Sequence, residues 1–347
     1  MGRAVAVLLA VVIAAPAAAE TRQPEARQPE TQQSGAWQPK TAGILTALHR
    51  VFRDDETGSV KIEAGGRFYR VTTTQDGLGL NPTSGPAEAP QPSDLIPGGK
   101  IAVGNNDIAM AWLADGTDRY PHGLLGDKIE ASAVRVLTAS RAPVDFVLRE
   151  DSVFEDIAPR LVDVDRDGRD EILVVRAHHE AGASLLLLGL RGDRLTRLAE
   201  SQAIGTPNRW INPVGVADFD GDGQAEIAAV ETPDIGGQLV IYKIEGRRLR
   251  EVARFVGYSN HVAGSAELGM SAVFDVNGDG IPDILLPSQD RRELRAVTFA
   301  KGNLAILQSV KLHRAVATAL VTDDVDRNGV LDIVFGDQNG YINVILR

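Results

Sequence analysis

Cysteine is missing from all 347 positions of this sequence. Its absence excludes disulfide bonds, zinc sites built on thiolates, thiol catalysis and a lipid-anchoring cysteine. Aromatic residues are also few, at 5% of the chain. A long chain without cross-links therefore needs another source of stability, and the sequence must be searched for it.

The chain also lacks a basic excess. Its 36 Lys and Arg residues stand against 47 Asp and Glu residues, which gives a formal net charge of −11. Nucleic acids and anionic membranes attract basic surfaces, so this balance argues against both as partners. Beyond the N-terminus no stretch approaches the roughly 18 apolar residues of a membrane helix. The most apolar later run, residues 185–190, has only the length of a strand.

The N-terminus has the pattern of a secretory signal peptide. Arg3 precedes an apolar stretch at residues 4–14, and small residues at 17–19 form an A-x-A type cleavage site. This pattern predicts a signal peptide over residues 1–19 and a mature protein exported to the periplasm or the outside, without a transmembrane segment after cleavage. An uncleaved anchor is the alternative. Residues 20–43, rich in Gln and Pro, are expected to be a disordered linker.

Glycine is abundant, with 35 residues, and short apolar runs are cut by Gly, Asp and Asn. This pattern favours an all-β chain of strands and turns. Residues 44–52 are expected to form one short helix. Residues 59–74 alternate like a β-hairpin, with Gly65 and Gly66 as its turn, and a Pro-rich stretch follows at 81–98.

One acidic motif occurs four times. Segments beginning DVDRDGRDEI, DFDGDGQAEI, DVNGDGIPDI and DVDRNGVLDI start at residues 163, 218, 275 and 324, at intervals of 49 to 57 residues. Four matches to D-x-[DN]-x-[DN]-G-x-x-[DE]-I at a nearly constant period indicate a repeat architecture.

The spacing of the motif favours calcium. Oxygen ligands at positions 1, 3, 5 and 9 can converge on one cation when the glycine at position 6 permits a sharp turn, and hard oxygen donors in a flexible loop select Ca²⁺. An EF-hand starts similarly but needs a glutamate at position 12. That position is apolar in all four copies, namely Val174, Ala229, Leu286 and Phe335. Acidic turns without a metal remain the second alternative.

The four segments resemble the cation loops of FG-GAP/VCBS repeats, the blades of integrin-α-type β-propellers. The resemblance implies that each loop joins the first two strands of a four-stranded blade and that the chain binds up to four Ca²⁺ ions. The implied side-chain ligands are Asp163, Asp165, Asp167, Glu171, Asp218, Asp220, Asp222, Glu226, Asp275, Asn277, Asp279, Asp283, Asp324, Asp326, Asn328 and Asp332.

The resemblance implies a propeller over residues 99–347, with residues 44–98 as an N-terminal extension and degenerate blade material. Dividing the chain by the repeat length suggests six blades, within a range of five to seven. The last repeat ends after about three strands, so it needs a fourth from the N-terminal region. An open, incomplete stack of blades is the alternative.

The least repetitive residues are expected on the face opposite the acidic loops. They form the candidate ligand-binding set of His122, His178, Arg209, Trp210, Tyr258 and His261. No catalytic motif occurs in its required context, and no catalytic residue is assigned. The sequence therefore favours a non-enzymatic recognition or scaffold module for a protein or glycan ligand. The alternative is a carbohydrate-active enzyme, such as a polysaccharide lyase or dehydratase, on a propeller scaffold.

Overall fold

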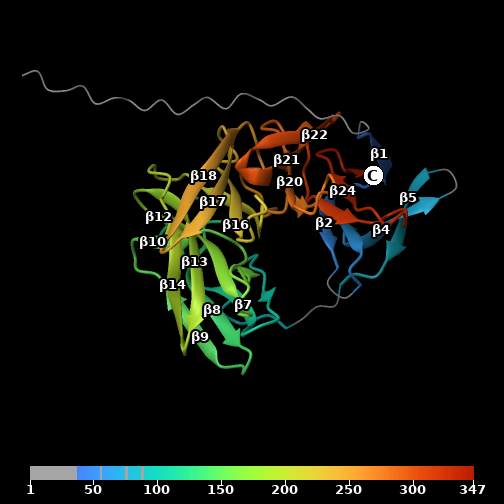
Figure 1. Ribbon diagram of the computed structural model, residues 1–347. Helices are drawn as coiled ribbons and strands as arrows, with labels where there is room; N and C mark the ends of the chain where they lie inside the picture. Colours follow the sequence, from blue (N-terminus) through green and yellow to red (C-terminus); the bar gives the residue numbers. More distant parts are fainter. Residues whose placement is uncertain (1–36, 55–56, 75–76, 87–89) are drawn as a thin grey trace, which may run out of the picture.

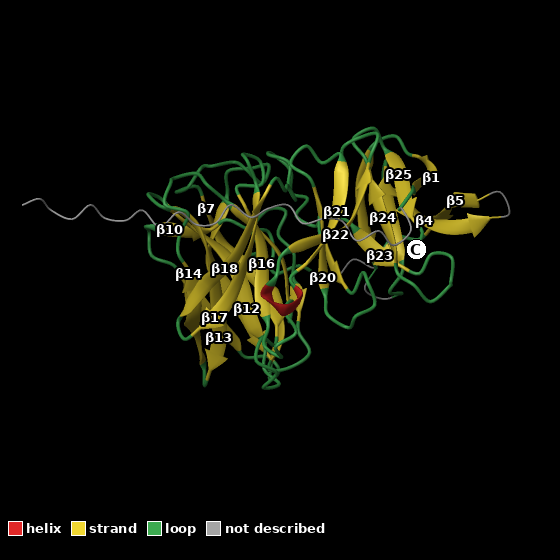
Figure 2. Ribbon diagram, turned by 45° about the horizontal axis from the view of Figure 1, so that its top comes forward, coloured by secondary structure: helices red, strands yellow, loops and turns green. Residues whose placement is uncertain are grey.

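The computed structural model describes residues 37–54, 57–74, 77–86 and 90–347, so the predicted signal peptide and most of the predicted linker lie outside the described residues. Strands dominate the described chain, and one 3₁₀ turn, Ala300–Gly302, is the helical element drawn in Figure 2. The all-β prediction is confirmed. In the described ranges no helix is long and apolar enough to cross a membrane.

The described strands form six antiparallel meanders of four strands, here called meanders 1 to 6. Meander 1 contains β2 (Leu48–Arg53), β3 (Val60–Ala64), β4 (Arg67–Thr74) and β5 (Gly77–Thr83). Meander 2 contains β6 (Ala102–Val103), β7 (Ile108–Thr117), β8 (Glu130–Thr138) and β9 (Pro143–Val147). Meander 3 contains β11 (Arg160–Val162), β12 (Glu171–His178), β13 (Gly182–Arg191) and β14 (Arg194–Ser201).

The C-terminal half repeats this plan. Meander 4 contains β15 (Ile211–Ala217), β16 (Glu226–Glu231), β17 (Gln238–Glu245) and β18 (Arg248–Val256). Meander 5 contains β19 (Ala272–Phe274), β20 (Asp283–Pro287), β21 (Glu293–Thr298) and β22 (Ala305–Lys311). Meander 6 contains β23 (Val321–Asp323), β24 (Asp332–Gly336) and β25 (Tyr341–Ile345), completed by β1 (Pro39–Ile44).

Meanders 2, 3 and 4 are joined edge to edge into one sheet. The short strand β10 (Ser152–Phe154) pairs with both β8 and β12, and β14 pairs in parallel with β18 at only two positions, Glu200 with Arg248 and Ser201 with Leu249. The rest of β14 has no strand partner on that side within the described chain. Meanders 3 and 4 therefore diverge on either side of the contact between β14 and β18.

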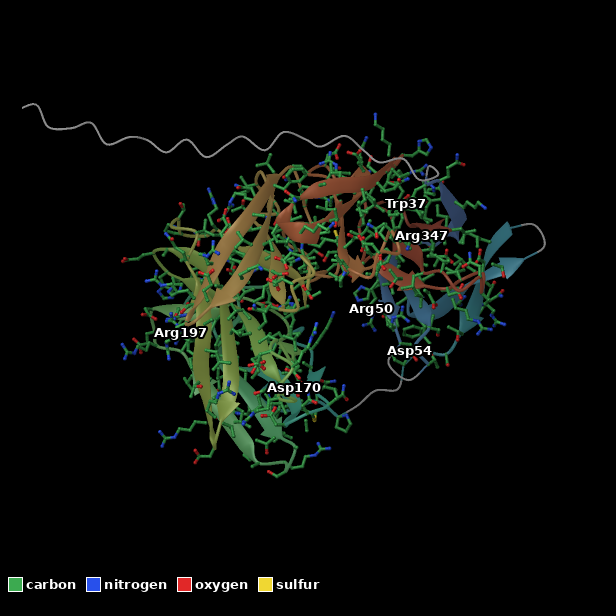
Figure 3. All side chains as sticks on the ribbon, viewed as in Figure 1. Trp37, Arg50, Asp54, Asp170, Arg197 and Arg347 are labelled. Carbon is green, nitrogen blue, oxygen red and sulfur yellow. The ribbon has the colours of Figure 1, made fainter. Side chains whose placement is uncertain are left out.

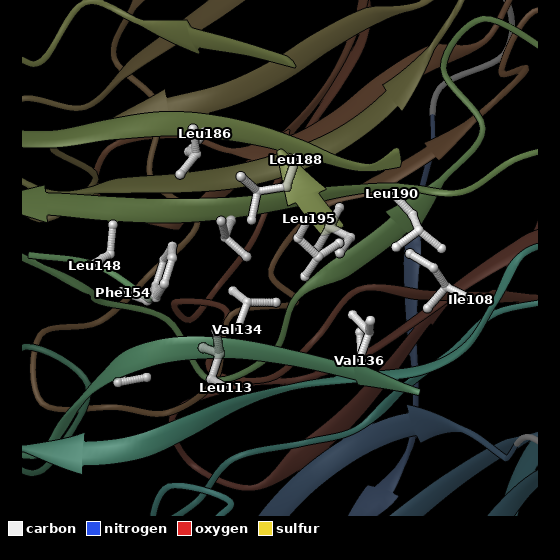
Figure 4. Packing of buried hydrophobic residues seen from close by; sticks show 14 of the residues in the cluster. Ile108, Leu113, Val134, Val136, Leu148, Phe154, Leu186, Leu188, Leu190 and Leu195 are labelled. Carbon is white, nitrogen blue, oxygen red and sulfur yellow. The ribbon is translucent and has the colours of Figure 1, made fainter. Parts of the chain in front are cut away.

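The second strands of meanders 3 to 6, namely β12, β16, β20 and β24, are apolar and buried on both faces. On β12, Ile172 and Val174 pack toward meander 2, whereas Leu173 and Val175 pack toward meander 4. Successive side chains of a strand point to opposite faces, which explains why these runs are apolar without alternation. Figure 4 shows the first of these cores, in which Leu113 and Val134 face Leu186 and Leu188.

Five such cores link the meanders in the order 2-3-4-5-6-1. Meander 1 therefore packs against meander 6, and Figure 1 shows β2 beside β24 although they are far apart in the sequence. Within the described residues no hydrophobic core spans meanders 1 and 2. The acidic loops consequently lie in meanders that have a packed neighbour on both sides.

Two local predictions differ from the structure. Residues 39–43, expected in the disordered linker, lie in β1 because the free edge of β25 supplies backbone partners for them. Residues 44–52, expected to be a short helix, instead form the end of β1, a turn and most of β2. The hairpin at residues 59–74 with its turn at Gly65 and Gly66 is confirmed by β3 and β4.

Candidate metal centres and the adjoining groove

Each acidic loop connects the first strand of a meander to the second. The acid at position 9 opens the second strand and pairs with the last residue of the first strand in all four loops: Glu171 with Val162, Glu226 with Ala217, Asp283 with Phe274 and Asp332 with Asp323. Strands flank each loop where an EF-hand would have helices. The structure therefore agrees with the loop position that the family resemblance implied.

A shared set of hydrogen bonds shapes the four loops. The aspartate at position 1 accepts a hydrogen bond from the glycine N–H at position 6 over 2.8–2.9 Å in every loop. The side chain at position 5 accepts one from the N–H two residues later over 2.7–2.9 Å. The glycines at position 6 have φ of 81° to 92°, a region that side chains with a Cβ rarely adopt. These bonds curl the backbone so that the acidic oxygens face inward.

The acid at position 9 is buried at the base of each loop. One of its oxygens accepts the N–H of position 2 over 2.8–3.1 Å in all four loops. The second oxygen is buried without a hydrogen-bond partner in three of them, at Glu171, Glu226 and Asp283. A buried carboxylate oxygen without a partner is costly, and a cation bound in the loop would satisfy it.

Burial also perturbs these carboxyl groups. Desolvation raises the pKa of Glu171 to about 7, and the charges of Asp165 and Asp167 add to the effect. Desolvation likewise raises the pKa of Asp283 to about 6. A group whose negative charge is disfavoured in this way gains most from a neighbouring positive ion.

The acids converge most closely in three loops. Carboxylate oxygens lie within 4.8 Å of one another in Asp163, Asp165 and Glu171, in Asp218, Asp220 and Glu226, and in Asp324, Asp326 and Asp332. The loop at 275–283 has Asn277 at position 3, so it offers fewer charges. The donor sets at residues 163–171, 275–283 and 324–332 fit a hard cation, with oxygen ligands from positions 1, 3, 5 and 9.

The loop at 218–226 differs, because a lysine side chain reaches into it. The ammonium nitrogen of Lys243 lies 2.6 Å from an oxygen of Asp220 and 2.6 Å from one of Asp222. Hydrogen bonds to these two carboxylates raise the pKa of Lys243 above its ordinary value. The residues of this loop therefore do not fit a bound cation as they stand. The sequence search missed Lys243, since it lies on β17, outside the motif.

A groove of about 870 Å³ runs between the first two acidic loops, from meander 3 to meander 4. Leu187, Leu198 and Ile244 provide apolar lining, while Arg191, Arg197 and Arg247 are exposed along it. Figure 3 marks Arg197 at this side of the molecule. Glu171 and Glu226 are also among the lining residues, so the groove adjoins both loops. These arginines could not be grouped from the sequence, because the pairing of β13 with β14 and of β17 with β18 brings them together.

Three of the predicted ligand-binding residues gather on the other side of the meanders. His122, Arg209 and Trp210 line a hollow of only about 40 Å³ together with Asp234. His122 Nδ1 lies 2.5 Å from Glu155 Oε1, and the Trp210 indole donates a hydrogen bond of 2.8 Å to the Glu155 carbonyl. The hollow is far smaller than the ~300–1,000 Å³ of typical ligand pockets.

Of the other three predicted ligand-binding residues, His261 adjoins this hollow, whereas His178 and Tyr258 lie elsewhere. The ring of His261 packs on Trp210 with centroids 4.8 Å apart, and its Nδ1 lies 2.8 Å from Asp234. His178 on β12 faces Ser184 and Glu200 instead. Tyr258 is fully buried beneath the guanidinium of Arg295. The structure thus brings His122, Arg209, Trp210 and His261 together and leaves His178 and Tyr258 apart.

Fold and loops together define an all-β repeat protein whose repeat unit is a four-stranded meander with an acidic first loop. Comparison with protein families specifies the repeat: residues 163–229 match the model of the FG-GAP-like repeat. This segment is therefore similar to an FG-GAP-like repeat, and the loops at 275–283 and 324–332 have the same hydrogen-bond geometry as its acidic loops.

Comparison with solved structures finds a WD40 domain of coronin from Toxoplasma gondii. It has 9% sequence identity and a TM-score of 0.42, over 92% of this chain and 88% of that chain. The search of curated proteins finds no match.

Proposed function

We propose that this chain is an exported calcium-binding β-propeller that acts as a non-enzymatic recognition or scaffold module for a protein or glycan. Each of the six meanders is one blade of the propeller, and β1 completes the last blade beside β25. The observation that carries the metal assignment is the buried carboxylate oxygen at position 9 that has no hydrogen-bond partner, at Glu171 and at Asp283.

Calcium fits these loops better than other common ions. The donors are carboxylate and amide oxygens without nitrogen or sulfur, which disfavours zinc and copper. The loops are short and exposed at positions such as Asp165 and Asp167, and Ca²⁺ tolerates such flexible geometry whereas Mg²⁺ demands a near-ideal octahedron. In a chain without cysteine, the ions would stabilise the first turn of the blades that carry these loops.

Thermal melting tests the metal assignment. EDTA is expected to lower Tm by several degrees, because each lost ion removes roughly 1 kcal/mol of stability at millimolar calcium. Added Ca²⁺ should restore Tm better than Mg²⁺. Asp163→Asn should reduce this recovery, whereas Asp193→Asn, a control at a side chain that is 95% exposed, should not. Identical melting curves in EDTA and in Ca²⁺ would refute the assignment.

The groove between meanders 3 and 4 is the proposed recognition surface. Its volume of about 870 Å³ lies within the ~300–1,000 Å³ of ligand sites. A cation in the loop at 163–171 and Lys243 in the next loop would neutralise the acids that line it. Arg191, Arg197 and Arg247 add three exposed positive charges along the groove, of which Arg197 pairs with Glu200 over 2.8 Å. The expected ligand therefore carries negative charge.

Binding to a panel of acidic and neutral oligosaccharides and peptides tests this surface. An acidic ligand should bind in the presence of Ca²⁺, and Arg197→Gln together with Arg247→Gln should weaken it at least tenfold. Arg194→Gln, at a side chain that is 84% exposed and outside the groove lining, is the control. Turnover of a bound polysaccharide would instead support the carbohydrate-active enzyme. N-terminal sequencing of the exported protein should begin at Glu20, after the predicted cleavage site.

A further inference from the structure

Lys243 occupies the place that a cation would take in the loop at 218–226. Its ammonium lies 2.6 Å from Asp220 Oδ2, 2.6 Å from Asp222 Oδ2 and 3.4 Å from Glu226 Oε1. These three acids are positions 3, 5 and 9 of the loop, which are three of its four expected side-chain ligands. An ammonium has three donors, so one lysine can face three converging carboxylates.

The sheet register directs Lys243 to this place. Lys243 on β17 pairs directly with Glu226 on β16, so both side chains leave the same face of the sheet. The aliphatic part of the Lys243 side chain only has to reach past the neighbouring strand, β16, to contact the loop. The side chain is 25% exposed, and Glu226 is fully buried. Glu226 therefore lies at the base of the loop, and the Lys243 ammonium contacts its acids from the neighbouring strand.

In the other acidic loops no described lysine or arginine forms ion pairs with two loop carboxylates. The guanidinium of Arg347 lies near the third and fourth loops, but it donates to the carbonyls of Val276 and Leu331. Gly189 pairs with Glu171 in meander 3. In meander 5 the pair Ile284 and Val297 places Thr298 opposite Asp283, and in meander 6 the pair Ile333 and Ile345 places Leu346 opposite Asp332. None of these side chains is charged. The nearest cation to Glu171 is Arg191, at 4.0 Å and 43% exposed, which is a looser arrangement than that of Lys243.

A tethered ammonium and a calcium ion exclude each other here. Both need the inward oxygens of Asp220, Asp222 and Glu226, and two positive ions a few ångströms apart repel strongly. Calcium must therefore displace Lys243, whose two close ion pairs would be lost. The lysine is always present at the loop, whereas a weakly bound ion depends on its concentration outside the cell.

We propose that Lys243 is the built-in counter-ion of the loop at 218–226, so that this loop keeps its shape without a metal ion. The chain then takes up calcium only at residues 163–171, 275–283 and 324–332. The statement about the other loops rests on the proposed function, but the role of Lys243 in its own loop does not. Of the four acidic loops, three then depend on a bound ion and the loop at 218–226 does not.

Counting bound ions in Lys243→Met tests the proposal. After dialysis against millimolar Ca²⁺, elemental analysis should find one more ion per chain in this variant than in the wild type. Adding Asp220→Asn to the variant should remove the extra ion, whereas Asp220→Asn alone should not change the wild-type count. Lys311→Met, at an exposed lysine on β22, is the matched control and should bind as the wild type does. A wild type that loses one ion on Asp220→Asn overturns the proposal.

Melting in EDTA separates this proposal from the proposed function. Lys243→Met should melt several degrees below both the wild type and Lys311→Met, because four carboxylates are then left without a cation. Added Ca²⁺ should restore most of the loss. If no ion binds to any variant but Lys243→Met still lowers Tm in EDTA, the calcium function fails and the counter-ion stands. An unchanged Tm of Lys243→Met in EDTA overturns the counter-ion.

Discussion

Glu130 is a buried acid that no acidic loop contains. It opens β8, is only 2% exposed, and lies near other acids. Desolvation, with a smaller contribution from the charges of Glu155, Asp127 and Asp156, raises its pKa to about 9. Glu130 therefore keeps its proton at neutral pH in the folded chain and loses it in the unfolded chain.

Replacing Glu130 by Gln should remove a pH dependence of stability. The unfolded state releases the proton near the ordinary glutamate pKa of 4.5 and the folded state near a pKa of 9, so wild-type stability falls as the pH rises through this window. Gln mimics the protonated acid, so Glu130→Gln should match the wild type at pH 5 and exceed it at pH 8 by about 1 kcal/mol or more, the limit being ~1.4 kcal/mol per pH unit. Urea unfolding at both pH values measures this.

The exposed Glu150→Gln is the control for this experiment, and it should change stability equally at both pH values. Comparing each variant with the wild type at the same pH cancels the other titrating groups. An equal difference at pH 5 and pH 8 for Glu130→Gln would show that the folded chain does not hold this proton.

Trp210 was chosen from the sequence as a ligand-binding residue, and the structure buries it to 2% exposure. Its indole donates a 2.8 Å hydrogen bond to the Glu155 carbonyl. Trp210→Phe leaves that carbonyl buried without its donor, and should therefore lower the free energy of unfolding by about 1–3 kcal/mol. Trp112→Phe is a matched control with a smaller expected loss, because its acceptor Asp94 is 24% exposed. Unfolding in denaturant measures the free energy of each variant. A Trp210→Phe variant as stable as the wild type would contradict this role of Trp210.

At the scale of elements, the acidic loops could be predicted from the sequence because their determinants lie within nine residues. The hydrogen bonds that Gly168 N–H donates to Asp163 and Arg169 N–H donates to Asp167 are local, and so is the glycine conformation. Lys243 could not be predicted, since its place depends on the register between β16 and β17. The same holds for β1, whose polar sequence gives no strand signal and which is a strand only because β25 presents an edge.

Removing β1 should therefore expose that edge. A chain that starts at residue 45 leaves the backbone groups of β25 without the partners seen at Thr41 and Asn343. Free edges pair with other chains, so this truncation should melt at lower temperature and self-associate. A chain that starts at residue 37 keeps β1 and is the matched control. Light scattering after gel filtration and thermal melting measure both effects, and a stable monomer from the shorter chain would show that β1 is dispensable.

At the scale of the whole molecule, the sequence predicts a repeated unit of about 50 residues, but it does not predict the order in which the units pack. The period gives the length of one unit because meanders 3 to 6 each carry one copy of the motif. Packing of meander 1 on meander 6 depends on contacts between residues such as Ile62 and Val344, nearly three hundred positions apart. No local pattern specifies such a contact, which is why an open stack and a closed ring both remained possible.

The packing order predicts what a cut between meanders 1 and 2 would do. Meander 1 is tied to meander 6 by β1 and by the core of Val51, Ile62, Val334 and Val344, whereas no core of the described residues links it to meander 2. A protease site inserted after the exposed Pro90 should thus be cut without dissociation. Gel filtration after cleavage should return one species that contains both fragments, with Tm within a few degrees of the uncut chain.

A second site inserted after Gly192, in the tight turn between β13 and β14, is the contrasting case. Cleavage there should lower Tm more, because it severs a hairpin whose strands share two cores. Separation of the fragments after the first cut would mean that the chain connection, rather than the core with meander 6, holds meander 1 in place.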